Sequence, residues 1–318
     1  MGLPLGVRIK PREVPVRNHR AYTLCVTGAM SLVIALLGAG CGSGSSTGTG
    51  TGTAPSASPV GKVDSIAAQV PAAVRSKGTL TVAADATYAP NEFIGSDGHT
   101  VVGMDADLAK AIGQVLGLKI SVVNATFDTI IPGLASGKYD LGMSSFTDTL
   151  ERQKTVDFVT YFLAGTSFYV KASGPGIASL AGLCGHKVAV EKGTTQAADA
   201  QAEAPKCQSA GHPLTVEIFN DQNAVNLALS SGRADVAMAD SPVAAYQVKQ
   251  SGGTFRLSGK AYGTAPYGIA IPKNNGMAKP ILAAVKHLMA TGTYMKILGR
   301  WGIQSGAITN PKINGATS

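Results

Sequence analysis

Small hydroxyl residues followed by one arginine mark the stretch from Ser144 to Phe158. Its sequence, SSFTDTLERQKTVDF, follows the apolar run YDLGM and contains Ser144, Ser145, Thr147 and Thr149 ahead of Arg152. The planar guanidinium of arginine binds both oxygens of a carboxylate, and hydroxyls and backbone N–H groups occupy the remaining lone pairs. The pattern therefore predicts a carboxylate site. The alternative is a solvated helix start, with Asp148 or Thr149 as N-cap and Arg152 exposed.

The elements that must position these residues alternate between strands and helices. Residues 78–85 (GTLTVAAD) are typical of a buried strand. Residues 104–117 predict a helix ending at Gly117, with apolar residues at helical spacing at Leu108, Ile112, Val115 and Leu116. The same alternation continues downstream, with strands such as HKVAVEKGTT, LTVEIF and ADVAMAD and helices such as AVNLALSSGR. Strands alternating with helices predict an α/β fold with parallel strands.

Two segments share one plan, which suggests two similar halves. GLASGKYDLGMSS and ALSSGRADVAMADS each contain a helix end, a Ser-Gly-basic turn, an Asp, an apolar strand and polar residues. Ligands of open α/β sheets bind beyond the carboxyl ends of the strands. We therefore expect Ser144, Ser145 and Thr147 of one half to face Asp240 and Ser241 of the other.

The N-terminus predicts export. A basic region ends at Arg20, an apolar run follows, and Cys41 comes directly after small residues. The order is typical of a bacterial lipoprotein signal, although Gly38 stands where leucine is usual; an uncleaved membrane anchor is the alternative. The Gly/Ser/Thr-rich residues after Cys41 predict a flexible tether. We expect lipidation at Cys41 and anchoring at the outer face of a bacterial cell membrane.

Charge and cysteine usage exclude several functions. The formal net charge is +8, but the first 40 residues contribute +5 and −1, so +4 remains on the rest of the chain, with no basic run interleaved with aromatics. Nucleic-acid binding is therefore not expected. Cys184 and Cys207 remain after the signal and predict a disulfide in an oxidising compartment, with two buried free thiols as the alternative. The five histidines have no metal-ligand spacing, and we expect no metal or cofactor.

The chain resembles the family 3 extracellular solute-binding proteins, which are the amino-acid receptors of ABC importers. The matching segments run in family order through nearly all of residues 78–302: DATYAPNEF, VVGMDADLAKAIGQVLG, FDTIIPGLASGKYDL, SSFTDTLERQKTVDF, VAVEKGTTQ, GRADVAMADSPVAAY and PYGIAI. The resemblance implies a two-lobed periplasmic-binding-protein-like fold of type II, with two open α/β sheets joined by a two-segment hinge. We expect hinge segments near residues 165–170 and 263–271.

The resemblance also implies a domain order. We expect a signal peptide at 1–40, a tether at 41–76, the first part of lobe 1 at 77–166, lobe 2 at 167–262, the return to lobe 1 at 263–305 and a C-terminal tail at 306–318. The partners are an amino acid and the subunits of an ABC permease, and the receptor is expected to be a monomer.

The resemblance assigns ligand-binding roles to individual residues. Arg152 would bind the α-carboxylate, with Ser145, Thr147 and Thr195, and Asp240 would bind the ammonium group. Tyr88 and Phe127 would pack on the ligand side chain, which Asp85 would approach. Thr195 as a mere N-cap, Asp240 as a cap of the following helix and Phe127 as a core residue are the alternatives. Asp105 and Asp107 are expected to cap the helix of residues 104–117.

Departures from the family pattern bear on specificity. Asn91 stands where the family often has Phe, which predicts a more polar pocket. Glu191 disfavours an acidic ligand, although Lys192 next to it would offset this charge. The expected ligand is a polar neutral or basic amino acid. The sequence has no G-x-S-x-G motif and no nucleophile–base pair, so no enzyme is expected; an enzyme on the same fold and a sensory module remain alternatives.

Overall fold

The computed structural model describes residues 60–316. The expected signal peptide, the lipidation site at Cys41 and most of the expected tether lie outside the described residues. Within residues 60–316, no helix is long and apolar enough to span a membrane.

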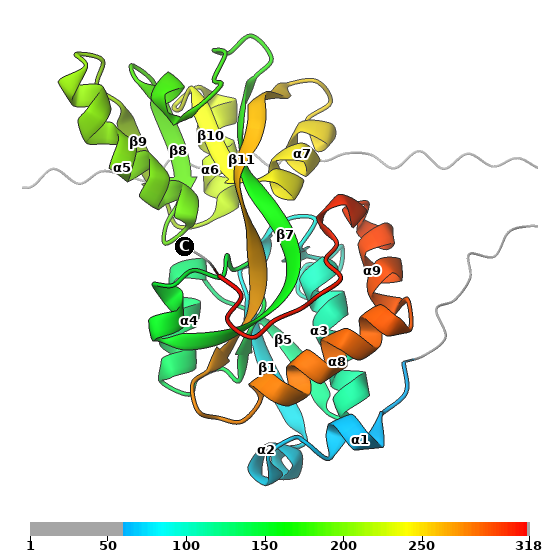
Figure 1. The fold of residues 1–318 in the computed structure, drawn as a ribbon. Coiled ribbons are helices and arrows are strands. Elements are labelled where there is room, and N and C mark those ends of the chain that lie inside the picture. The colour runs from blue at the N-terminus through cyan, green and yellow to red at the C-terminus, as the bar shows by residue number, and fades with distance from the viewer. Residues whose placement is uncertain (1–59, 317–318) are drawn as a thin grey trace, which may run out of the picture. The chain divides into compact units, whose positions relative to one another are not determined.

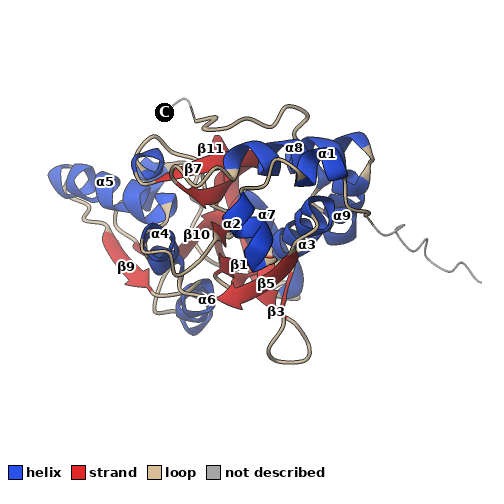
Figure 2. Ribbon diagram, turned by 90° about the horizontal axis from the view of Figure 1, so that it is seen from below, coloured by secondary structure: helices blue, strands red, loops and turns tan. Residues whose placement is uncertain are grey.

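The helices surround one large sheet (Figures 1 and 2). The α-helices are α1 (Asp64–Ala67), α2 (Ala72–Lys77), α3 (Met104–Leu116), α4 (Phe127–Ala135), α5 (Thr195–Ser209), α6 (Gln222–Ser231), α7 (Ser241–Gln250), α8 (Ala278–Ala290) and α9 (Thr293–Trp301). Short 3₁₀ helices are η1 (Arg152–Lys154), η2 (Leu180–Leu183) and η3 (Gln304–Gly306).

Eight strands form one hydrogen-bonded sheet, in the order β5-β1-β6-β11-β7-β10-β8-β9. These strands are β1 (Thr79–Ala84), β5 (Lys119–Asn124), β6 (Leu141–Gly142), β7 (Val156–Lys171), β8 (Lys187–Glu191), β9 (Thr215–Phe219), β10 (Val236–Asp240) and β11 (Phe255–Pro272). A second, three-stranded sheet contains β2 (Thr87–Tyr88), β3 (Glu92–Ile94) and β4 (Val101–Val102).

Two long antiparallel strands belong to both halves of the fold. β7 pairs with β11 along most of its length, from Phe255↔Lys171 to Pro272↔Val156, with register shifts between Ser258 and Gly268. The expected α/β fold of two lobes is confirmed, and β7 and β11 join the strands of the lobes into one continuous sheet. The residue boundaries expected for the lobes stay a prediction, because these strands serve both.

The two segments with a shared plan lie symmetrically in the sheet. β6 pairs with β11 and β10 pairs with β7, so the two strands flank the central pair. Lobe 1 here means α1 to β6 with α8 and α9, and lobe 2 means η2 to α7. Because β6 and β10 both end towards the region between the lobes, the polar residues after each strand meet there.

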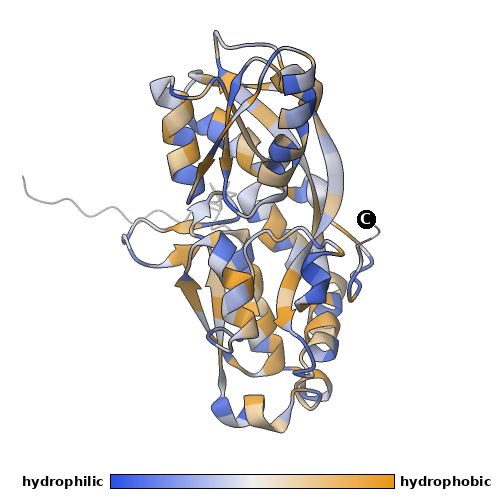
Figure 3. Ribbon diagram, turned by 90° about the vertical axis from the view of Figure 1, so that its left-hand side faces the viewer, coloured by the Kyte–Doolittle hydropathy of each residue, from blue (hydrophilic) through white to orange (hydrophobic). Residues whose placement is uncertain are grey.

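Each lobe has its own hydrophobic core. In lobe 1, α3 packs against α1, α8 and α9, and Leu108, Ile112, Val115 and Leu116 are all buried, as their spacing predicts. Gly117 ends α3 at φ 69°, a left-handed conformation that favours glycine. In lobe 2, Val188 and Val236 of neighbouring strands are buried beneath α5. Figure 3 shows the matching pattern, with hydrophobic and hydrophilic segments alternating along the helices.

The expected tether ends earlier than residue 76. Residues 64–77 contain α1 and α2, and Ile66 and Val70 are buried in the lobe 1 core. Val63 N–H also donates to the Val115 carbonyl, at 3.0 Å. These two helices are too short for an apolar period to be recognised in the sequence, and they pack on other elements: α1 on α3 and α8, and α2 on β1.

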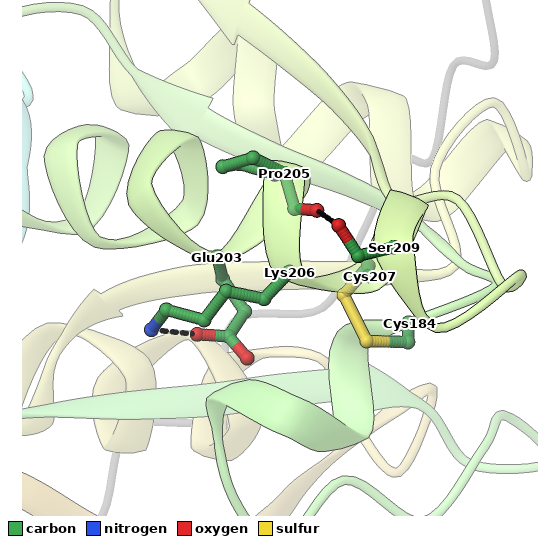
Figure 4. Close-up of a disulfide and its surroundings, with 6 residues drawn as sticks. All are labelled: Cys184, Glu203, Pro205, Lys206, Cys207 and Ser209. Atoms are coloured by element: carbon green, nitrogen blue, oxygen red, sulfur yellow. Dashed lines mark hydrogen bonds and ion pairs between the residues drawn. A yellow bond between two sulfur atoms is a disulfide. The ribbon is translucent and has the colours of Figure 1, made fainter.

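Cys184 and Cys207 form a disulfide, with an S–S distance of 2.02 Å and a Cα–Cα distance of 5.0 Å. Cys207 lies in the last turn of α5. Glu203 lies beside the bond and accepts from Lys206 Nζ at 2.7 Å (Figure 4). The sulfurs and the Glu203 carboxylate lie within 4.8 Å of one another. Because the sulfurs are bonded to each other, they are not available as thiolate ligands.

Candidate ligand-binding site

One pocket collects the residues on which the sequence analysis concentrated. All nine expected ligand-binding residues line it: Asp85, Tyr88, Phe127, Ser145, Thr147, Arg152, Glu191, Thr195 and Asp240. Ser144, Thr194 and Gln196 complete the lining.

Arg152 is held from both lobes. Its Nη1 donates to the Thr147 carbonyl at 2.8 Å, and its Nη2 donates to the Gly193 carbonyl at 3.0 Å. The guanidinium lies over the rings of Phe127 and Phe146, with Cζ 5.3 Å and 5.5 Å from the ring centroids. Burial lowers the pKa of Arg152 to about 10, so it remains a cation at neutral pH. The half-buried side chain lines the pocket, which differs from the exposed helix residue of the alternative interpretation.

Ser145 occupies a constrained position at the end of β6. Its φ is 51°, which is rare for a residue other than glycine. Three contacts hold it: its N–H donates to Asp105 Oδ2 at 2.8 Å, its Oγ donates to Glu92 Oε2 at 3.2 Å, and Asn91 Nδ2 donates to that Oγ at 2.9 Å. Because its own proton is committed to Glu92, the Ser145 hydroxyl offers the pocket an acceptor.

These contacts correct two expectations. Asp105 does not cap α3; it is fully buried and accepts from Ser145 N–H and from Tyr161 OH, the latter at 2.7 Å. Asn91 is also buried and supports Ser145 instead of lining the pocket. Burial raises the pKa of both Glu92 and Asp105, and the charge of Asp105 raises that of Glu92 further. Asp107 accepts from Arg300 and Trp301, at 2.8 Å and 3.0 Å.

The start of α5 brings three residues to the pocket. Thr194 is the N-cap, since its Oγ1 accepts from Ala197 N–H at 3.1 Å, so Thr195 is free of that role. Gln196 Nε2 donates to Asp240 Oδ1 at 2.8 Å and to Thr166 Oγ1 at 2.9 Å. The N-terminus of a 15-residue helix also supplies free N–H groups and a partial positive charge.

Asp240 ends β10 without capping α7 through its side chain. Its N–H donates to Tyr88 OH at 2.9 Å, across the two lobes. Burial raises the pKa of Asp240 to about 6, and the Arg152 cation acts in the opposite direction. Arg152 and Asp240 are thus close enough for their charges to interact, and they form one charged end of the pocket.

Two further carboxyl groups form the other end. Asp85 Oδ1 accepts from Thr87 Oγ1 at 2.7 Å, and its Oδ2 accepts from Phe127 N–H at 2.9 Å. Burial raises the pKa of Asp85. Burial and then the charge of Asp85 raise the pKa of Glu191 well above its ordinary value. Among the described residues, Glu191 Oε1 is buried with no hydrogen-bond partner.

Lys192 does not offset Glu191. Its Nζ pairs with Asp128 Oδ2 of lobe 1 at 2.8 Å. The lining of the pocket therefore contains three carboxyl groups, at Asp85, Glu191 and Asp240, and one cation, at Arg152. When all are ionised, the net charge is 1 − 3 = −2. A site of this charge favours a ligand with excess positive charge.

Sequence reasoning missed three supporting features of the site. Gln196 follows Thr195 in a matched segment, but its bond to Asp240 joins residues 44 positions apart. Glu92 and Asp105 are likewise brought together from β3 and α3. Glu92 stands in the segment DATYAPNEF, which matches the family, so the resemblance could have indicated it. Nothing in that segment shows that the Glu92 carboxylate faces Ser144 and Ser145.

Comparisons with known proteins agree with this geometry. A family model described as "Bacterial extracellular solute-binding proteins, family 3" matches residues 80–304. The arginine-binding protein ArgT of Corynebacterium glutamicum is 34% identical over 254 residues, which cover 79% of this chain and 83% of that protein.

Two solved structures carry the comparison further. An ancestral arginine-binding protein bound to arginine has a TM-score of 0.67 and 37% identity, covering 70% of this chain and 98% of that one. The ancestral amino-acid-binding protein AncCDT-1, described as a precursor of cyclohexadienyl dehydratase, has a TM-score of 0.65 and 35% identity, covering 72% of this chain and 97% of that one.

Proposed function

Because this chain belongs to the family 3 bacterial extracellular solute-binding proteins and is an amino-acid receptor of ABC transport, we propose that its ligand is a cationic amino acid, with arginine as the first candidate. The binding of arginine by ArgT and by the ancestral protein supports this choice. The lining of the pocket supports it independently.

The two charged ends of the pocket match the two ends of such a ligand. Arg152, with the hydroxyls and N–H groups of Thr147 and Thr195, binds the α-carboxylate. Asp240 and the Ser145 hydroxyl bind the α-ammonium group. Tyr88 and Phe127 pack on the aliphatic part of the side chain, and Asp85 and Glu191 bind its cationic end.

Glu191 is the observation that carries this proposal. Glu191 Oε1 accepts from no donor among the described residues, and its carboxyl lies at hydrogen-bond range of the Asp85 carboxyl, so a cationic group of the ligand would bind both once they are ionised. Since Lys192 is committed to Asp128, no neighbouring lysine fills this role. A neutral polar ligand would leave the Asp85–Glu191 end with unbalanced charge.

Titration calorimetry with arginine, lysine, glutamine and glutamate tests the ligand class. We expect arginine to bind best and glutamate worst. Glu191→Gln should lower the preference for arginine over glutamine by about tenfold or more, because a charged hydrogen bond contributes about 1.5–3 kcal/mol.

Glu217→Gln is the matched control, since it removes a carboxylate of the same lobe that does not line the pocket. The preference of this control variant for arginine over glutamine should equal that of the unmodified protein. Glutamine or glutamate binding tenfold tighter than arginine would overturn the proposal.

A second candidate function is favoured by the relation to AncCDT-1. Two pocket acids with raised pKa values, Glu191 and Asp240, are suited to proton donation. We propose binding without turnover, since the pocket lacks a nucleophile–base pair among its lining residues. Arginine incubated with the protein and followed by NMR should stay unchanged; steady product formation would establish the enzyme instead.

The remaining parts of the proposal concern how the receptor is anchored at the cell membrane and presented to its permease. Lipidation at Cys41 would anchor the receptor beside its permease, and a monomer would present both lobes to it. The order of basic, apolar and small residues before Cys41 supports the anchor. Mass spectrometry of the mature protein should find Cys41 as the modified first residue, and Cys41→Ser should accumulate as precursor.

A further inference from the structure

Residues 304–316 form a strap along β7, where the sequence predicted only a tail. β7 pairs with β11 on one side, but β10 pairs only with its second half, from Thr166 to Val170. The strap occupies the free side of the first half, with bridges Val159↔Ile313 and Phe162↔Ala307. In Figure 1 it is the red segment that crosses β7 and β11. It therefore covers a sheet edge that would otherwise be unpaired.

Asn314 turns the end of the strap. Its φ is 52°, a conformation that asparagine tolerates better than most residues. Its N–H donates to the Phe158 carbonyl at 2.9 Å, and its Oδ1 accepts from Phe158 N–H at 2.8 Å. Its Nδ2 also donates to Asp157 Oδ1 at 3.1 Å. Three groups of one residue thus fix the direction in which the chain continues.

The residues after Asn314 reach the segment that carries Arg152. Gly315 N–H donates to Asp148 Oδ2 at 2.7 Å, and Ala316 N–H donates to the same oxygen at 3.2 Å. The other oxygen, Oδ1, accepts from Gln153 Nε2 at 2.7 Å. Asp148 is only 2% exposed, so the backbone of the strap supplies two of the three donors that satisfy this buried carboxylate.

Both neighbours of Asp148 hold Arg152. The Thr147 carbonyl accepts from Arg152 Nη1 at 2.8 Å, and Thr149 Oγ1 accepts from Arg152 N–H at 3.2 Å. Fixing Asp148 therefore helps to fix the Thr147 carbonyl, which holds the guanidinium, and the Thr149 hydroxyl, which holds the Arg152 backbone.

We infer that the strap is a positioning element for ligand binding, and that Asn314 and Asp148 are positioning residues that hold Arg152 in its binding orientation. The inference rests on the proposed role of Arg152. The strap begins at residue 304, where the region matched by the family model ends. It acts on the carboxylate end of the ligand only, because its contacts reach Asp148 and not the Asp85–Glu191 end.

A double-mutant cycle tests the inference. The dissociation constant of arginine is measured by calorimetry for Asn314→Ala and for a chain ending at Pro311, each with Arg152 and with Arg152→Lys. We expect each strap variant to weaken binding about tenfold with Arg152 present, since the strap contributes hydrogen bonds to a charged group. In the Arg152→Lys background the same changes should alter binding by less than about twofold, because the bidentate fork that needs orienting is gone.

Lys312→Ala is the matched control, since Lys312 contributes only backbone groups to β7 and its side chain is exposed. It should bind arginine like the unmodified protein. Circular dichroism establishes folding, and if the shortened chain does not fold, Asn314→Ala alone decides. Unchanged binding, or equal losses in both backgrounds, would overturn the inference. If another amino acid proves to be the ligand, the proposed substrate fails, and the same cycle with that amino acid still decides the role of the strap.

Discussion

Single side chains at this site have most of their hydrogen-bonding capacity committed before any ligand arrives. The Ser145 hydroxyl donates to Glu92, Asp85 accepts from Thr87 and Phe127, and Arg152 donates to carbonyls of both lobes. Groups that already have hydrogen-bond partners cannot rotate freely. Little conformational entropy is therefore lost when the ligand binds. Pre-organisation of this kind favours affinity and restricts the ligands that fit.

Arg152 is the residue with the largest expected effect. Arg152→Ala should weaken arginine binding by roughly 2–5 kcal/mol, because the ligand carboxylate would lose its charged partner in a closed site. Arg152→Lys should also bind much more weakly, since an ammonium group cannot replace the bidentate fork. Calorimetry on folded protein checks both. Affinity of Arg152→Ala within about threefold of the unmodified protein would show that another group binds the carboxylate.

The raised pKa values of the pocket acids predict opposite effects of pH on stability and on binding. Asp240 has a folded pKa of about 6, above its ordinary value, so its contribution to the unfolding free energy is greatest below pH ~4 and is lost as the pH rises through about 6. Asp85 and Glu191 shift in the same direction. A cationic ligand needs these groups ionised. The increase in Tm caused by arginine should therefore grow from pH 5 to pH 7.5.

Calorimetry in buffers of different ionisation enthalpy should show that binding releases protons. Glu191→Gln should release fewer protons than the unmodified protein, because one titrating group is removed. A ligand-induced Tm increase that shrinks as the pH rises would contradict the proposed roles of these acids.

At the scale of single residues, the sequence predicted which residues line the pocket but not the buried residues that support them. The nine residues expected to bind the ligand all line the pocket. They could be predicted because they stand in segments shared with a known family. Their individual binding roles remain predictions. Asn91 and Asp105 were misplaced because their partner, Ser145, is at least 40 residues away in the chain. The pairing of Lys192 with Asp128 joins two lobes and has no local signal.

The elements show how one helix serves two purposes. α5 presents Thr195 and Gln196 to the pocket at its start, and Cys207 ties its last turn to Cys184 ahead of β8. The helix is weakly amphipathic, with Pro205 inside it, and its buried residues are few, among them Ala197, Ala200 and Cys207. The covalent link therefore holds an element that has little apolar surface to hold it otherwise.

Removing the disulfide should lower stability more than affinity. The bond joins residues separated by 23 positions, and closing a loop of this length contributes about 3 kcal/mol in the chain-entropy account. The double variant Cys184→Ser/Cys207→Ser should unfold at a lower urea concentration. Arginine affinity should change by less than about threefold, since no contact of the pocket is altered. An unchanged unfolding midpoint would contradict this prediction.

Elements with a strong hydrophobic periodicity were predicted well from the sequence, and short elements were not. α3, β1, β8, β9 and β10 follow from their apolar patterns, whereas β7 and β11 were expected only as hinge segments. β2, β3 and β4 contain two or three residues each, too few to show alternation, and they form only because Thr87, Phe93 and Val102 pair across turns. The strap has no hydrophobic period at all. Its partners in β7 lie about 150 residues earlier, as the Asn314–Phe158 contact shows with a separation of 156.

For the whole molecule, we expect closure of the lobes to be the motion on which function depends. Protein groups already bridge the lobes at Tyr88–Asp240, Arg152–Gly193, Thr87–Gln222 and Asp128–Lys192. β7 and β11 are the two connections about which the lobes move. Ligand should shrink the radius of gyration measured by solution scattering.

Gly193 offers a test of this closure. Its φ is 79°, and a Cβ there would lie 2.9 Å from the Asp128 Cβ of the opposite lobe. Gly193→Ala should therefore oppose closure and weaken arginine binding about tenfold or more, as a strained contact of 1–3 kcal/mol implies. Gly185→Ala is the matched control, since its φ is 83° and a Cβ would contact nothing within 4 Å. Equal affinity of the two variants would show that the contact does not limit closure.

The position of β11 has a consequence for the biogenesis of the protein. β11 lies between β6 and β7 and spans Phe255–Pro272, so neither half of the sheet is complete until these late residues have been synthesised. Folding that waits for distant partners is slow. If the chain is exported unfolded, as its basic and apolar N-terminal residues predict, this delay would keep the nascent polypeptide competent for translocation. A fragment covering residues 60–254 should accordingly remain unstructured, and the receptor should acquire its native state only after its passage is nearly complete.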